Sequence, residues 1–180
     1  MLRTPLVMGC GALACFAANA EGQSVTPLRL GAGIGTSLNI QTGVPQSMHA
    51  VLSLTSHAPG SRLGFRVEAL VDGSQEGVHR EGEPFTWVTD RTVALTINPV
   101  FRVWGRRTGL YVIAGVGIYQ NWHETRPLGS TPTRISHFDM GVNLGAGFDF
   151  KAFDRQMFFE SRLHTQGFHN RAATTLGIRF

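Results

Sequence analysis

Cysteine and long apolar runs are scarce in this sequence, and each scarcity excludes a class of protein. Both cysteines of the chain, Cys10 and Cys15, lie within its first twenty residues. Residues 21–180 therefore form no disulfide framework, so their stability must come from backbone pairing and burial. After Ala20, no segment approaches the roughly 20 consecutive apolar residues that a membrane-spanning helix requires.

Lysine is almost absent as well. The sequence has 16 basic and 12 acidic residues, and Lys151 is its only lysine. Along the predicted strands the arginines occur singly and do not gather into the basic cluster that nucleic-acid binding needs, so we expect no nucleic-acid partner. Guanidinium groups instead suit paired contacts with carboxylates and phosphates.

The first twenty residues have the three parts of an export signal. A positively charged start is followed by an uncharged apolar run and by the small-x-small cleavage site Ala18-Asn19-Ala20. The sequence therefore predicts a cleaved signal peptide at 1–20 and one domain at 21–180. The alternative is a lipoprotein signal acylated on Cys15, although Leu13 then occupies a position where a small residue is expected.

Beyond this segment, apolar and polar residues alternate in eight stretches. Residues 28–40 and 138–150 are the clearest, with aliphatic or aromatic residues on one phase and glycine or polar residues on the other. A period of two is typical of β-strands, so the sequence predicts an all-β fold. The predicted strands are 28–40, 47–57, 62–72, 90–103, 109–122, 138–150, 156–165 and 172–180.

The connections between the predicted strands alternate in length. Short turns are predicted at 58–61, 105–108 and 151–155, and longer loops at 41–46, 73–89, 123–133 and 166–171. Neighbouring strands joined in this way predict an antiparallel barrel with one rim of short turns and one rim of longer loops.

The polar phase of the strands indicates which face lies inside. It consists mostly of glycine and of charged residues of both signs, whereas a soluble sheet would expose lysine, glutamate and threonine. Glycine weakens an exposed strand face, but in a narrow lumen it leaves room for long, paired side chains. We therefore expect an apolar outside and a charged lumen. The charged residues assigned to the lumen are Arg29, Arg66, Glu68, Arg102, Asp139, Asp149, Glu160, Arg162 and Arg179.

The export signal, the eight alternating strands and the terminal Gly177-Ile178-Arg179-Phe180 together resemble the small outer-membrane β-barrel proteins of the OmpA/OmpX-like family. The resemblance implies an eight-stranded antiparallel up-and-down transmembrane β-barrel in the outer membrane of a Gram-negative-type cell. It also implies that Phe180 is part of the assembly signal.

The same resemblance sets the expected partners and role. The partners would be outer-membrane lipids, lipopolysaccharide and, during biogenesis, the barrel assembly machinery. We expect a monomer without a cofactor, with a structural or surface-interaction role.

Two other functions stay open. A secreted, soluble lipocalin-like barrel would show the same alternation with its apolar face inside. A lipid A-modifying enzyme would share the membrane barrel, and the lipid A deacylases of this fold carry a His-x-Ser pair near the penultimate strand. The aligned position here reads His164-Thr165-Gln166, and no histidine is followed two residues later by serine. Because this nucleophile is missing, we expect no catalytic site.

Most of the histidines fall in or beside the predicted longer loops. Their spacing is not that of a metal site, so we expect none. If a metal did bind at this rim, the candidate ligands would be His123, His137 and His169.

Overall fold

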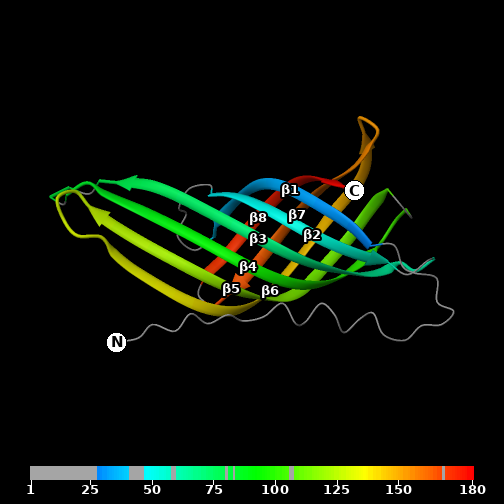
Figure 1. Cartoon of the computed structure of the whole chain (residues 1–180), viewed down its shortest axis with the longest axis horizontal. Helices are drawn as coiled ribbons and strands as arrows, with labels where there is room; N and C mark the ends of the chain where they lie inside the picture. The colour runs from blue at the N-terminus through cyan, green and yellow to red at the C-terminus, as the bar shows by residue number, and fades with distance from the viewer. Residues whose placement is uncertain are drawn as a thin grey trace, which may run out of the picture.

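The strands close into a barrel in which every strand pairs with its neighbours in the sequence and β8 pairs with β1 (Figure 1). This computed structural model describes residues 28–40, 47–57, 60–79, 81–82, 84–105, 108–167 and 169–180. The predicted signal peptide, 1–20, lies outside the described residues. The strands found in the described residues are β1 (Leu28–Asn39), β2 (Ser47–His57), β3 (Leu63–Val78), β4 (Thr86–Arg102), β5 (Gly109–Pro127), β6 (Thr133–Ala152), β7 (Arg155–Gln166) and β8 (His169–Arg179).

The predicted fold class, an eight-stranded antiparallel up-and-down barrel, is confirmed. Closure pairs Ala32 of β1 with Ile178 of β8, and the backbone N–H of Phe180 donates to the carbonyl of Leu30 at 2.8 Å. Within the described residues, no helix is long and apolar enough to cross a membrane.

The alternation places apolar side chains on the outside of the barrel. Ile34, Val116 and Leu144 are each at least 60% exposed on the outer face, whereas Arg66 and Asp149 are at most 1% exposed inside. This is the reverse of a soluble protein, so the lipocalin-like alternative is wrong. The outer face is instead suited to the hydrocarbon of a membrane.

Glycine in the lumen makes room for aromatic rings, in addition to the long, paired side chains that the sequence predicted. A Cβ atom on Gly147 would lie 2.4 Å from the Tyr111 ring, and one on Gly177 would lie 2.3 Å from the Phe158 ring. Both distances are far below van der Waals contact, so each ring occupies space that only glycine leaves open.

Several strands are longer than the sequence predicted. The predicted loop 73–89 is mostly the ends of β3 and β4, and the predicted loop 123–133 is shortened by the end of β5 and the start of β6. The loop 166–171 is likewise shortened by β7 and β8. The sequence does not reveal these extensions because polar residues occupy much of both faces, so the apolar alternation stops while backbone pairing continues.

The extensions of β3 to β6 rise beyond the other strands as a projecting sheet, seen at the left of Figure 1. It consists of residues 73–78, 86–91, 122–127 and 133–136. Pairing of β2 with β3 ends at Gly73, and pairing of β6 with β7 begins only at Gly141. In the predicted topology, this rim faces the outside of the cell.

Candidate functional site

Four buried charges join opposite walls of the barrel. Arg66 and Glu68 lie on β3, and Glu160 and Arg162 lie on β7, four strands away around the closed sheet. Arg66 Nη1 donates to Glu160 Oε2 at 2.6 Å, and Arg162 Nη2 donates to Glu68 Oε1 at 2.7 Å. Within each strand, Arg66 also contacts Glu68 and Arg162 also contacts Glu160. The two positive and two negative groups thus form one central network across the lumen.

Polar side chains from other strands satisfy the remaining atoms of this central network. Tyr111 donates its hydroxyl to Glu160 at 2.7 Å, and Asn98 Nδ2 donates to Glu68 at 2.8 Å. Thr55 accepts from Arg66 Nε at 3.1 Å, and Asn143 donates to Asn98 at 2.8 Å. Buried charges are tolerated only when they are paired and hydrogen-bonded in this way.

A second cluster lies toward the rim of short turns, centred on Asp149. Its carboxylate contacts Arg102 Nη2 and Arg179 Nε, each at 2.8 Å. The Arg179 guanidinium also lies 4.5 Å from the centre of the Phe158 ring and donates to the Tyr111 hydroxyl at 3.2 Å. Tyr111 therefore connects this cluster with the central network.

Two residues assigned to the lumen lie apart from these clusters. Arg29 is half-buried, and its Nη1 donates to Gln156 at 3.1 Å. Asp139 is half-buried near the opposite mouth, where it accepts from Asn121 Nδ2 at 3.0 Å. The other seven assigned residues meet in the two clusters.

The outer mouth holds polar groups to which the sequence analysis gave no role. Asp72 pairs with Arg171 at 3.1 Å, and it accepts from Ser37. His49 Nε2 lies 2.7 Å from the Thr175 hydroxyl. All of these residues occupy the polar phase of their strands, and that phase was the only sequence signal that could have found them.

His164 lies inside the lumen, away from lipid. Its Nδ1 is 3.1 Å from the Tyr119 hydroxyl, and the ring is 5% exposed. Gln166, at the position where the deacylases have serine, is buried on the same phase. The position therefore holds no serine, and both side chains face the lumen.

The rim histidines form separate pairs with aspartate. His123, in β5, lies 2.7 Å from Asp90, and His137, in β6, lies 3.2 Å from Asp139. Both histidines belong to paired strands and not to a loop. The side chain of His169 lies outside the described residues. Among the described side chains, no three potential metal ligands gather in one place.

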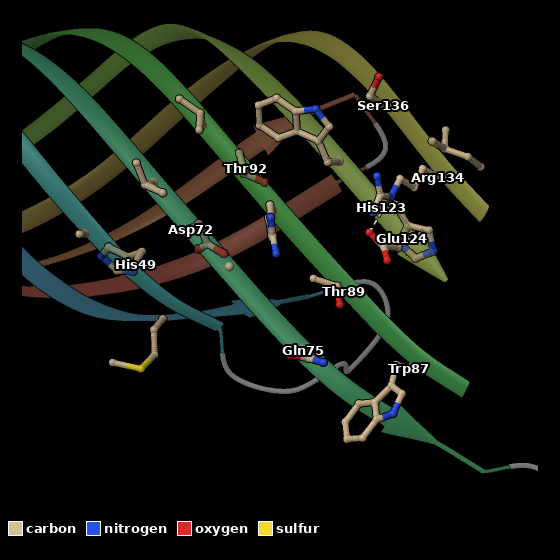
Figure 2. Close-up of a pocket in the computed structure, with 18 of the residues that line it drawn as sticks. His49, Asp72, Gln75, Trp87, Thr89, Thr92, His123, Glu124, Arg134 and Ser136 are labelled. Carbon is tan, nitrogen blue, oxygen red and sulfur yellow. Dashed lines mark hydrogen bonds and ion pairs between the residues drawn. The ribbon is translucent and has the colours of Figure 1, made fainter. Parts of the chain in front are cut away.

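The projecting sheet borders a broad, open depression of about 1,230 Å³. Figure 2 shows that residues of both phases surround it, with His49, Asp72 and Thr92 toward the lumen and Trp87, Glu124 and Arg134 toward the outer end of the sheet. The depression is therefore lined by side chains from both faces of the projecting sheet.

No protein-family model matches this sequence, and no curated protein matches it. Solved structures do match the fold. Ail, the attachment invasion locus protein of Yersinia pestis, solved in complex with the heparin analogue sucrose octasulfate, superposes with a TM-score of 0.60 at 11% identity, covering 85% of this chain and 97% of Ail.

Two further structures agree. A major outer membrane protein from Thermus thermophilus gives a TM-score of 0.58 at 12% identity, over 85% of this chain and 99% of the other. Neisserial surface protein A gives 0.52 at 11% identity, over 88% and 98%. The fold is that of the small outer-membrane β-barrels. The resemblance to these barrels predicted from the sequence is thus confirmed as a likeness of fold, and together with the apolar outer face it defines a transmembrane barrel of the outer-membrane type.

Proposed function

We propose that the protein is a non-enzymatic integral barrel of the outer membrane with a structural or surface-interaction role. The observation that carries this proposal is the central network, in which Arg66, Glu68, Glu160 and Arg162 connect opposite walls. An eight-stranded barrel is only wide enough to be filled by its side chains, so this network closes the lumen to solutes. Function then resides on the outside of the barrel and at its projecting sheet.

The proposed partners are outer-membrane lipids and lipopolysaccharide, with the barrel assembly machinery acting during biogenesis. In this proposal the barrel works as a monomer, because closure leaves each strand below the rim paired on both sides. The proposal includes no cofactor. The similar Ail structure holds a sulfated sugar analogue, and exposed arginines on the projecting sheet support an anionic partner here too.

Conductance tests the closed lumen. We expect the purified barrel, inserted into planar lipid bilayers, to give no large and steady ion currents, because buried ion pairs occupy the lumen. A general-diffusion porin inserted under the same conditions provides the positive control. Steady currents from the barrel would contradict the proposal and would indicate a transport path along the arginines and glutamates.

A further inference from the structure

The two faces of the projecting sheet carry opposite charge. The outward phase holds Arg91, Arg126 and Arg134 with a single acid, Glu124, which gives a formal charge of +2 (three positive minus one negative). On the phase that continues the lumen, the described residues include Glu76 and Asp90 and no arginine or lysine. A sheet surrounded by water on both sides needs no such separation, so the two faces meet different surroundings.

The cationic face continues directly upward from the membrane-facing belt. Val71, Val93 and Phe138 are exposed at the upper end of the belt, and the register places Arg91, Trp122 and Ser136 two residues further along the same phase. Two residues of a strand span roughly 7 Å, and less along the membrane normal because barrel strands tilt. The first arginine therefore lies at the level where hydrocarbon gives way to headgroups.

Two tryptophans stand among these arginines. Trp87 and Trp122 are each 42% exposed on the outward phase, and cross-strand pairing sets Trp87 opposite Arg126 and Trp122 opposite Arg91. Tryptophan concentrates at membrane–water interfaces, where one part of its ring system is apolar and another is polar. Their position marks this face as interfacial.

The guanidinium groups retain free hydrogen-bonding capacity. Glu124 contacts Arg134 Nε at 2.8 Å and Arg126 Nη2 at 3.7 Å, so one carboxylate serves two arginines. Both arginines remain more than half exposed. Arg91 is exposed and forms no ion pair with any side chain among the described residues. Arginine binds phosphate oxygens through its planar fork, which is the chemistry left available here.

We propose that the outward face of the projecting sheet binds the phosphate groups of lipopolysaccharide, with Arg91, Arg126 and Arg134 as ligands and the two tryptophans at the interface. The sheet then stands among the headgroups of neighbouring lipids and turns its acidic face toward the barrel mouth. This inference rests on the proposed outer-membrane location, and it deepens that proposal by assigning the lipid contact to named residues. Because the cationic face is continuous with the membrane-facing belt, a lipid is favoured over a soluble polyanion as its ligand.

The test compares two triple variants in their folded state. In the first, Arg91, Arg126 and Arg134 are all replaced by Gln. In the matched control, Arg62, Lys151 and Arg155, which are exposed cations at the rim of short turns, are replaced by Gln. Each barrel is refolded in detergent, and its melting midpoint is recorded against increasing lipopolysaccharide with intact phosphates, against dephosphorylated lipopolysaccharide, and against soluble heparin.

We expect phosphorylated lipopolysaccharide to raise the midpoint of the wild type and of the control variant. The first variant should need at least about tenfold more, because each basic residue near an anionic membrane surface contributes roughly fivefold to binding. Dephosphorylated lipopolysaccharide should give a much weaker shift to all three proteins. Equal responses of both variants would overturn the inference, and so would protection of the wild type by heparin alone. Because all the proteins compared are folded barrels, either result leaves the proposed function intact, whereas failure to insert into lipid would count against that function instead.

Discussion

At the scale of single residues, the central network depends on each charge having its partner. Replacing Glu160 with Gln would leave Arg66 and Arg162 facing each other across one remaining acid, Glu68. Removing one partner of a buried ion pair costs about 3–5 kcal/mol, since the other charge stays buried. We expect the E160Q barrel to lose stability of that order in urea unfolding from detergent.

The surface pair between Lys151 and Asp154 provides the control for this prediction. Its atoms are 3.5 Å apart and both side chains are largely exposed. An exposed pair contributes about 0–1 kcal/mol, so D154N should unfold at nearly the wild-type urea concentration. If E160Q and D154N behaved alike, the buried charges would have no structural importance.

At the scale of the strand, β8 closes the barrel and is followed directly by Phe180. The Phe180 ring is 65% exposed, so burial of this ring in the fold contributes little, while its backbone N–H still pairs with Leu30. If the terminal aromatic is part of the assembly signal, deleting Phe180 should reduce the yield in the outer membrane of cells by severalfold. Refolding yield in detergent should remain close to wild type, because closure leaves no free strand edge below the rim.

Phe153 offers a matched comparison, since it is an aromatic residue in the β6–β7 turn and is 94% exposed. Replacing Phe153 with Ala removes a comparable ring from the rim of short turns without touching the last residue. It should leave cellular yield unchanged. Normal outer-membrane yield of the chain lacking Phe180 would show that this residue is an ordinary strand end.

The strands of the barrel wall could be predicted from the sequence, whereas the contacts between them could not. The barrel wall was predictable because apolar side chains mark every second residue, as in the 138–150 segment. The same parity assigned Arg66, Glu68, Glu160 and Arg162 to the inside, where they contact one another. The position of a residue in the alternation predicts which face of the strand it occupies, but not which side chain it contacts. The contact of Tyr111 with Glu160 and the separate position of Arg29 could therefore be found only from the pairing of the strands in the structure. The projecting sheet also could not be predicted, because polar residues such as Ser74 and Thr89 interrupt the alternation of apolar and polar residues that identifies a strand.

At the scale of the whole molecule, we expect the barrel to fold without the projecting sheet. The buried clusters lie below the rim, and Gly73 pairs with Arg91 while Trp122 pairs with Ser136 at the base of the sheet. Replacing 74–90 and 123–135 each with Asn-Gly would close both hairpins at these pairs with a two-residue turn. We expect the shortened barrel to refold in detergent with a melting midpoint within about 5 °C of wild type, because the buried ion pairs are retained.

A deletion in the barrel wall provides the contrasting case to the shortened hairpins. Removing one paired row inside the wall, Leu70 with Ala94 and its continuations around the barrel, exchanges the inward and outward faces on one side of the deletion and should prevent refolding. If the barrel with shortened hairpins failed to refold, the projecting sheet would be part of the folding unit.

The separation of charge between the two faces of the projecting sheet depends on whether each charged residue has an odd or an even position along its strand. Arg91 and Asp90 are neighbours in the chain, yet Arg91 lies on the outward face and Asp90 on the face toward the mouth. An insertion of one residue at the base of β4 would exchange them, carrying Trp87 inward and Asp90 outward, whereas an insertion of two would preserve both faces. Insertions at the base of these hairpins therefore preserve the two faces only when they add an even number of residues.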